Sequence, residues 1–120
     1  MIYYLVTPYS HEDPKVMKER YDASIEAQGK LMQAGLNVFN PLANSVPAFN
    51  AGYDIGDAIY EMDLEILRKC DALIVLKLDG WEKSKGVELE INEAIRLEMD
   101  RFFVTPKYIS TFVEYEKKCK

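Results

Sequence analysis

The sequence predicts an α/β fold of the flavodoxin or Rossmann-like kind, a three-layer sandwich whose parallel sheet of four or five strands carries helices on both faces. Short apolar runs without polar alternation, such as residues 2–7 and 71–78, are typical of strands that are buried on both faces. Amphipathic stretches of helical length separate these runs, and strand–helix alternation with short connections favours parallel strands. We expect residues 1–120 to form a single domain.

The first half of the chain predicts a strand, a long helix and a second, shorter strand. Residues 2–7 (IYYLVT) are β-branched, aromatic and apolar, as a buried strand requires. Pro14 stands where a helix can begin and a glycine follows Ala34, which predicts a helix over 15–34. LNVF (36–39) predicts the second strand, and the residues 41–53, rich in Pro, Asn and small side chains, predict a loop.

The second half repeats the alternation. Asp54 or Asp57 is expected to cap a helix that runs to about Lys69. The elements expected after it are a strand at 71–78, a helix from about 84 to 99, a strand at 101–105 and a short amphipathic helix at 108–118. Ligands of such sheets bind beyond the carboxyl ends of the strands, so we expect the loops that follow the first three strands to line the site.

The composition of the chain argues against several classes of function. The chain has 15 Lys and Arg against 20 Asp and Glu, and this net charge of −5 argues against a nucleic-acid groove. No apolar run reaches the roughly 18 residues of a membrane span, and the first residues lack a signal-peptide pattern. We therefore expect a cytoplasmic protein that binds neither a membrane nor nucleic acid.

The rare residues limit the possible chemistry. His11, Cys70 and Cys119 are too few and too far apart in sequence for a Cys/His zinc site, and a catalytic Ser-His-Asp triad could use His11 alone. Neither the dinucleotide motif GxGxxG nor the phosphate loop GxxxxGK[ST] is present, so we expect no metal and no cofactor. Any catalysis must then rely on carboxylates and hydroxyls.

Two carboxylates fall within or beside the apolar stripes of their helices. Asp63 lies about 40° from Ile59 around its helix, and Glu90 lies about 60° from Val87. An unpaired buried carboxylate is costly, which favours a shared polar site for the two. The structural alternative is that Asp63 pairs with Arg68, with Lys69 or with a loop amide, and that a carboxylate at the edge of such a stripe bends toward solvent.

Three segments resemble the nucleoside 2-deoxyribosyltransferase superfamily. YLVTPY (4–9) resembles its Y-L-A-G-P-F opening, and IYEMDLE (59–65) with CDALIV (70–75) resembles its D-L-x-x-(L/I)-x-x-A-D-x-x-(V/I) block. Gly80-Trp81, Ser84, Gly86, Glu90 and Ala94 are similar to its (D/S)-x-G-x-x-x-E-x-G-x-A signature. The form GW-x-x-S-x-G-x-x-x-E is closest to a small branch of phage and bacterial proteins. The resemblance spans residue 2 to about 105.

The resemblance implies roles for individual residues. Glu90 matches the carboxylate that attacks the anomeric carbon, Asp63 the carboxylate that helps protonate the leaving base, and Tyr4 the tyrosine that orients the nucleophile. The implied substrate-binding residues are Thr7, Pro8, Tyr9, Ser45, Gly80, Trp81, Ser84 and Gly86. A serine at position 84, where the transferases that act on free nucleosides carry Asp, implies a 5′-monophosphate as substrate. Ser84 also has a structural alternative as a helix cap, and Trp81 as a residue packed on its own domain.

These observations lead to one functional hypothesis and two rivals. The first is N-glycosidic bond cleavage, by hydrolysis or base exchange, in a nucleoside or nucleoside 5′-monophosphate, with Glu90 as nucleophile and water slightly favoured as acceptor. This would make the protein a glycosidase, or a transferase, that works as a homo-oligomer. The alternative is a non-catalytic nucleotide-binding or signal-sensing module on the same fold. A structural or interaction protein is the third possibility.

Overall fold

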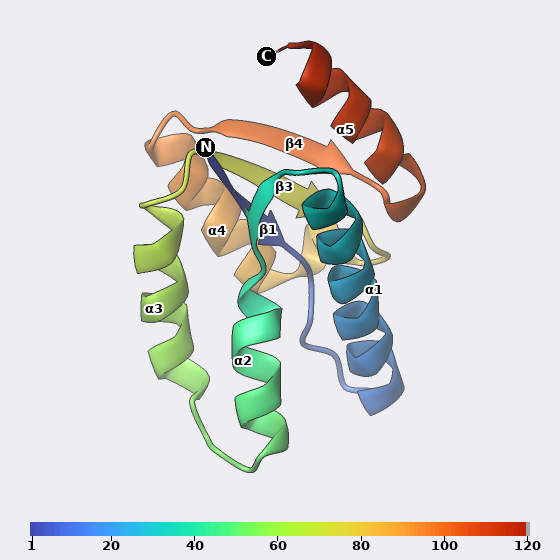
Figure 1. Ribbon diagram of the computed structural model, residues 1–120. Helices are drawn as coiled ribbons and strands as arrows, with labels where there is room; N and C mark the ends of the chain where they lie inside the picture. The colour runs from blue at the N-terminus through green and yellow to red at the C-terminus, as the bar shows by residue number, and fades with distance from the viewer. Residues whose placement is uncertain (120) are drawn as a thin grey trace.

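The computed structural model describes residues 1–119, and its centre is a parallel sheet of four strands (Figure 1). The strands, in the spatial order β2-β1-β3-β4, are β1 (Ile2–Val6), β2 (Asn37–Phe39), β3 (Ala72–Leu76) and β4 (Asp100–Val104). The register places Tyr4 of β1 between Phe39 of β2 and Leu73 of β3. The predicted α/β fold class is confirmed.

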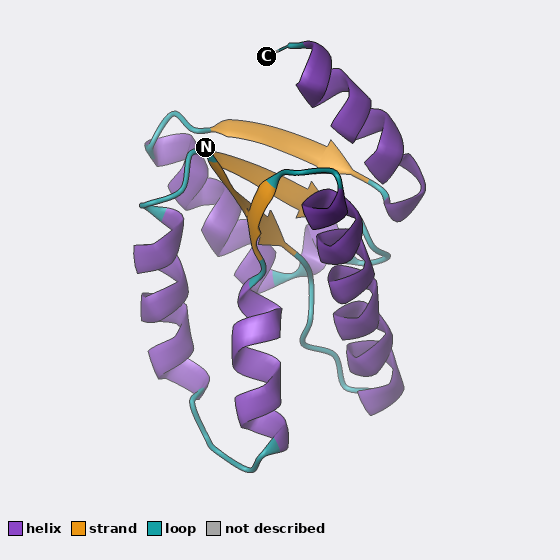
Figure 2. Cartoon of the chain, viewed as in Figure 1, coloured by secondary structure: helices purple, strands orange, loops and turns teal. Residues whose placement is uncertain are grey.

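Helices cover both faces of this sheet (Figure 2). The helices are α1 (Pro14–Gln33), α2 (Pro41–Asn50), α3 (Gly56–Leu67), α4 (Lys85–Arg96) and α5 (Ile109–Lys118). α1 and α5 pack on the face that carries Tyr3 and Leu5, whereas α3 and α4 pack on the face that carries Tyr4 and Val6. Alternate residues of β1 therefore enter two separate apolar cores, as expected for a strand buried on both sides.

The loop predicted at 41–53 is wrong for most of its length, because α2 occupies residues 41–50. The Oδ1 atom of Asn40 accepts the Leu42 N–H at 3.0 Å, and Pro41 takes the first helical position, where no N–H is needed. The Nδ2 atom of Asn40 donates to Ser24 Oγ at 3.0 Å and to Gln28 Oε1 at 3.1 Å, which fixes the start of α2 on α1. The Asn-Pro pair starts a helix here instead of simply closing a strand.

Several predicted boundaries also shift. Neither Asp54 nor Asp57 is the cap residue of α3, because Ile55 takes that position and makes no side-chain bond. Asp54, one residue before the cap, accepts the Gly56 N–H at 3.4 Å. α4 ends at Arg96, ahead of the predicted position 99, because Glu98 adopts a left-handed φ of 55° that stops the helix. No helix in the described part of the chain has both the length and the apolar character to cross a membrane.

Candidate active site

The expected contact between β1 and α4 is present. Tyr4 is fully buried, and its hydroxyl donates a hydrogen bond to Glu90 Oε2. Its ring packs against Phe39 with 5.8 Å between centroids, which holds the hydroxyl in place. Burial and the nearby carboxylates of Glu90 and Asp63 raise the pKa of Tyr4, so the hydroxyl remains a proton donor at any physiological pH.

Asp63 of α3 lies near the hydrogen bond between Tyr4 and Glu90. Its side chain is partly buried, and its Oδ1 atom is buried without a hydrogen-bond partner among residues 1–119. Burial raises the pKa of Asp63 to about 6. The two cations that could have neutralised it are paired elsewhere, because Arg68 contacts Glu93 at 2.6 Å and Lys69 contacts Glu65 at 3.7 Å. The structure does not support the structural alternative for Asp63.

Glu90 is partly buried on α4, and its environment favours the protonated acid. Burial raises its pKa to about 8, and the negative charge of Asp63 acts in the same direction, whereas the hydrogen bond from Tyr4 lowers it. Two carboxyl groups that influence one another in this way titrate as a pair. At neutral pH such a pair holds one proton, so it can offer one acid and one carboxylate at the same time.

The start of α4 gathers several of the expected binding residues. Ser84 is the cap of the helix, since its Oγ accepts the Val87 N–H at 3.3 Å. A Cβ atom on Gly86 would lie 3.9 Å from a ring carbon of Tyr60 and 4.0 Å from Ser84 Oγ, so these three residues are neighbours. Tyr60 is not among the residues that the sequence predicts for the site, and the structure places it beside two that are. The signal for it was its position one turn before Asp63 on the same helix.

The loops that follow β1 and β3 lie side by side. Arg20 of α1 donates from Nη1 to the Ser10 carbonyl and from Nη2 to the Asp79 carbonyl, both at 3.0 Å. This arginine, which the sequence analysis also missed, therefore joins the expected binding loop of Thr7, Pro8 and Tyr9 to the one that begins at Gly80. Thr7 is buried at the end of β1, and its Oγ1 has no partner among the described residues.

Two other expected residues have structural surroundings. Trp81 packs against Phe103 of β4 with 5.6 Å between ring centroids, as its structural alternative supposed. Ser45 is buried on α2, and no hydrogen bond joins it to Tyr4 or Glu90 in the part of the chain that the structure describes. A role for either residue in binding stays a prediction.

A cavity at the other end of the sheet offers a different environment. It has a volume of about 680 Å³ and lies beside the start of β1 and along β2, where Ile2, Phe39 and Cys70 help to line it. No carboxylate lines it, so acid–base chemistry fits the Tyr4–Glu90–Asp63 group better. Within residues 1–119, no three His, Cys, Asp or Glu side chains come together as a metal-binding group.

The fold also occurs in a known enzyme. The chain is similar to the solved structure of a 2-deoxyribosyltransferase from the psychrotolerant bacterium Bacillus psychrosaccharolyticus. The TM-score is 0.66 at 21% sequence identity, and the match covers 88% of this chain and 73% of that one. At this identity the likeness shows a common fold.

Sequence comparison gives a family. No curated protein matches the sequence. A family model described as "Domain of unknown function (DUF1937)" matches residues 1–105, which include Tyr4, Asp63 and Glu90. The chain belongs to this DUF1937 family.

Proposed function

We propose that this protein cleaves the N-glycosidic bond of a nucleoside or nucleoside 5′-monophosphate, with Glu90 as the nucleophile. The observation that carries the proposal is the group formed by Tyr4, Glu90 and Asp63, in which a buried tyrosine holds one carboxylate beside a second. The structural neighbour is described as a biocatalyst for the synthesis of nucleosides, and its common fold supports the same substrate class here.

The chemistry divides into two balanced steps. In the first, a Glu90 oxygen bonds to the anomeric carbon while the bond from that carbon to the base nitrogen breaks and its electron pair goes to the base. Asp63, as the acid, donates a proton to the departing base. In the second, water attacks the anomeric carbon, Glu90 leaves, and Asp63 takes the proton from the water. A second nucleobase in place of water would give base exchange.

The hydroxyl of Tyr4 has a defined part in both steps. It donates to Oε2 of Glu90, so the second carboxylate oxygen stays free to attack. The same hydrogen bond favours the ionised form of Glu90 and thereby opposes the effect of burial. Tyr4→Phe should therefore lower the rate of bond cleavage while the binding of substrate changes little.

The start of α4 supports a phosphorylated substrate. Ser84 accepts a backbone N–H through its oxygen, which leaves the hydroxyl proton free to donate to an anion at a helix N-terminus. The exposed Lys83 and Lys85 place positive charge on either side of Ser84, and the exposed Glu82 and Glu88 place negative charge nearby. We favour a 5′-monophosphate over a free nucleoside because of the Ser84 hydroxyl at the helix N-terminus.

The rate should depend on pH in a specific way. Between the pKa values of Asp63 and Glu90, the more abundant singly protonated form carries its proton on Glu90 and its charge on Asp63. The reactive form, with ionised Glu90 and protonated Asp63, holds the same single proton, so its population rises and falls with pH in the same way. With pKa values of about 6 and about 8 for the two groups, kcat/KM is expected to be bell-shaped, with its maximum between these values. A rate that rises steadily from pH 5 to pH 10 would contradict the acid–base assignment.

The deciding experiment is incubation with a panel of nucleosides and 5′-monophosphates, followed by chromatography of the free bases. Release of base that is absent with Glu90→Gln supports the proposal. Thermal stabilisation by a nucleotide without release of base contradicts it and supports the non-catalytic binding module. Neither release nor stabilisation across the panel contradicts both.

A further inference from the structure

α3, which carries Asp63, is held to the rest of the protein mainly at its last turn. Leu67 is the buried residue of this helix, and Leu64 and Ile66 are partly buried against the same core. The earlier turns are largely exposed, and Figure 1 shows α3 extending away from the sheet toward the loop that joins it to α2. The position of Asp63 therefore depends on how the end of α3 is attached.

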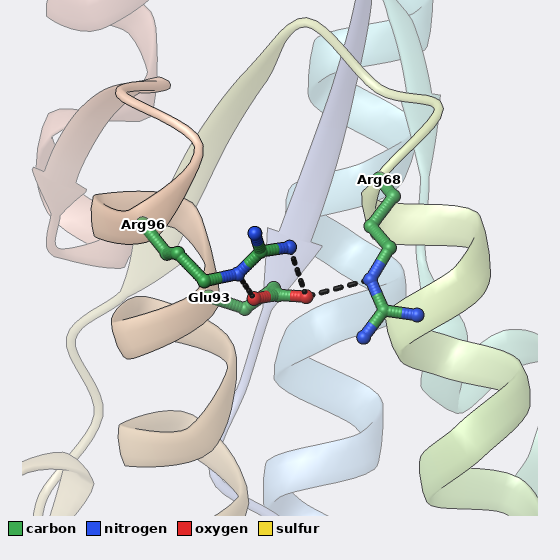
Figure 3. A network of polar contacts seen from close by, with 3 residues as sticks. All are labelled: Arg68, Glu93 and Arg96. Atoms are coloured by element: carbon green, nitrogen blue, oxygen red, sulfur yellow. Dashed lines mark hydrogen bonds and ion pairs between the residues drawn. The ribbon is translucent and has the colours of Figure 1, made fainter.

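An ion-pair cluster makes this attachment (Figure 3). Arg68, the residue after α3, donates from Nε to Glu93 Oε2 on α4 at 2.6 Å. Arg96, on the same helix as Glu93, donates from Nε to Oε1 at 2.5 Å and from Nη2 to Oε2 at 3.2 Å. The Glu93 side chain is only 10% exposed, whereas Arg68 is 44% and Arg96 is 63% exposed, so the carboxylate is covered and the two arginines reach solvent.

The two arms of the cluster do different things. Arg96 orients the carboxylate of Glu93 within α4, whereas Arg68 is the arm that reaches across from α3. Glu93 lies one helical turn after Glu90 on α4. Arg68 directly follows α3, the helix that carries Asp63. The same two helices thus carry both the ion pair and the two carboxylates of the candidate site.

We propose that the Arg68–Glu93 ion pair sets the distance between Asp63 and Glu90, which makes Glu93 and Arg68 positioning residues for the reaction. This proposal rests on the function proposed above. The two arginines hold the pKa of Glu93 at about 2, so the ion pair persists throughout the range in which Asp63 and Glu90 change protonation. The spacing of the two helices is therefore independent of the state of the site.

The proposal has a direct spectroscopic consequence. The titratable groups that face Glu90 are Tyr4 from β1 and Asp63 from α3. If α3 moves away, the charge of Asp63 acts on Glu90 from farther off and water enters, and both changes lower the pKa of Glu90. Removal of a positive charge alone has the opposite effect, since it disfavours the carboxylate. A lower pKa of Glu90 in a variant therefore indicates loss of positioning, and a higher pKa indicates loss of a positive charge alone.

The test compares Arg68→Gln with Arg96→Gln, by carbon-13 NMR titration of the side-chain carboxyls and by steady-state kinetics. Both variants remove one arginine from the same carboxylate, but Arg68 alone of the two belongs to the α3 side. We expect Arg68→Gln to lower the pKa of Glu90 and to reduce kcat about tenfold with little change in KM, because small displacements of reacting groups are costly. Arg96→Gln should change neither by much, and Arg68→Lys should restore part of the loss.

The results that would overturn the positioning proposal differ from those that would overturn the proposed function. If Arg68→Gln and Arg96→Gln give the same Glu90 titration and the same kcat, the positioning proposal is overturned. If the wild-type protein releases no base from any substrate, the proposed function fails, yet the titration still decides whether the ion pair spaces the two carboxylates.

Discussion

Tyr3 and Tyr4 are neighbours in β1, and each donates its hydroxyl to a glutamate, but on opposite faces of the sheet. Tyr3 contacts Glu116 of α5 at 2.5 Å, and Tyr4 contacts Glu90 of α4. The difference lies in what surrounds the glutamate, because Glu90 also faces the carboxylate of Asp63. A tyrosine–glutamate pair by itself serves packing as well as chemistry, and the second carboxylate distinguishes the candidate site.

At the residue scale, Glu90→Gln should separate catalysis from stability. The pKa of Glu90 is raised in the folded protein, so its contribution to stability is complete below its ordinary pKa and is lost as the pH rises through about 8. The glutamine variant has no charge to bury and should melt above the wild type at pH 9, while base release falls at least about 10²-fold.

Melting temperatures from pH 5 to pH 9, measured with base release on one preparation, check this expectation. Glu88→Gln is the matched control, since Glu88 is exposed on the same helix. A Glu90→Gln protein that melts well below the wild type at pH 9 yet keeps full activity would exclude Glu90 as the nucleophile.

At the scale of elements, one arginine of α1 fixes the relative position of two binding loops. Arg20 spans the Ser10 and Asp79 carbonyls, and Gly80 gives the second loop the conformation that this contact needs. Gly80 has a φ of 84°, in the left-handed region, and a Cβ there would lie 3.0 Å from Arg20 Nη2. The glycine is thus required for both backbone conformation and close approach.

Gly80→Ala should therefore weaken substrate binding as well as stability. Backbone strain alone costs about 1 kcal/mol, and displacement of Arg20 is expected to raise KM several-fold by freeing the two loops. Gly35→Ala is the control, because Gly35 has a φ of 91° with no atom within 4 Å of the added carbon. Chemical denaturation and steady-state kinetics of both variants decide the matter, and an equal KM in the two would contradict the role given to Arg20.

At the scale of the whole molecule, the region of α2 and α3 leaves apolar side chains uncovered. The residues concerned are Phe49, Tyr53, Tyr60 and Met62, with exposed fractions of 36%, 67%, 46% and 37%. Two of them, Tyr60 and Met62, lie on the helix that carries Asp63. Exposed apolar groups gathered on neighbouring elements are typical of surfaces that bind another protein chain.

We expect a homo-oligomer, at least a dimer, in which this surface is covered by a second copy near the site. Light scattering should give a mass of at least twice 13.8 kDa at working concentration, and a monomer of 13.8 kDa would contradict the expectation. The double change Phe49→Ser and Tyr53→Ser should promote dissociation. Tyr115→Ser on α5, where the side chain is 57% exposed, should leave the mass unchanged.

The strands and the helix caps could be predicted to different degrees. All four strands were placed correctly to within two residues, because an apolar run buried on both faces carries its own signal. α2 was missed because Asn40 and Pro41 read equally well as the end of a strand and as the start of a helix. The contacts of Asn40 with Ser24 and Gln28 on α1 favour the helix, and these are tertiary contacts.

The sequence by itself determined the fold class and marked Asp63 and Glu90 as carboxylates on the apolar sides of their helices, because periodicity is a local property. Only the tertiary structure decided that the Tyr4 hydroxyl bonds to Glu90, that Arg68 pairs with Glu93 instead of Asp63, and that Arg20 joins two loops. Each of these contacts joins different elements, and the packing of helices on the sheet sets which side chains come within reach. A charged residue with several possible partners near it in sequence takes the one that this packing presents.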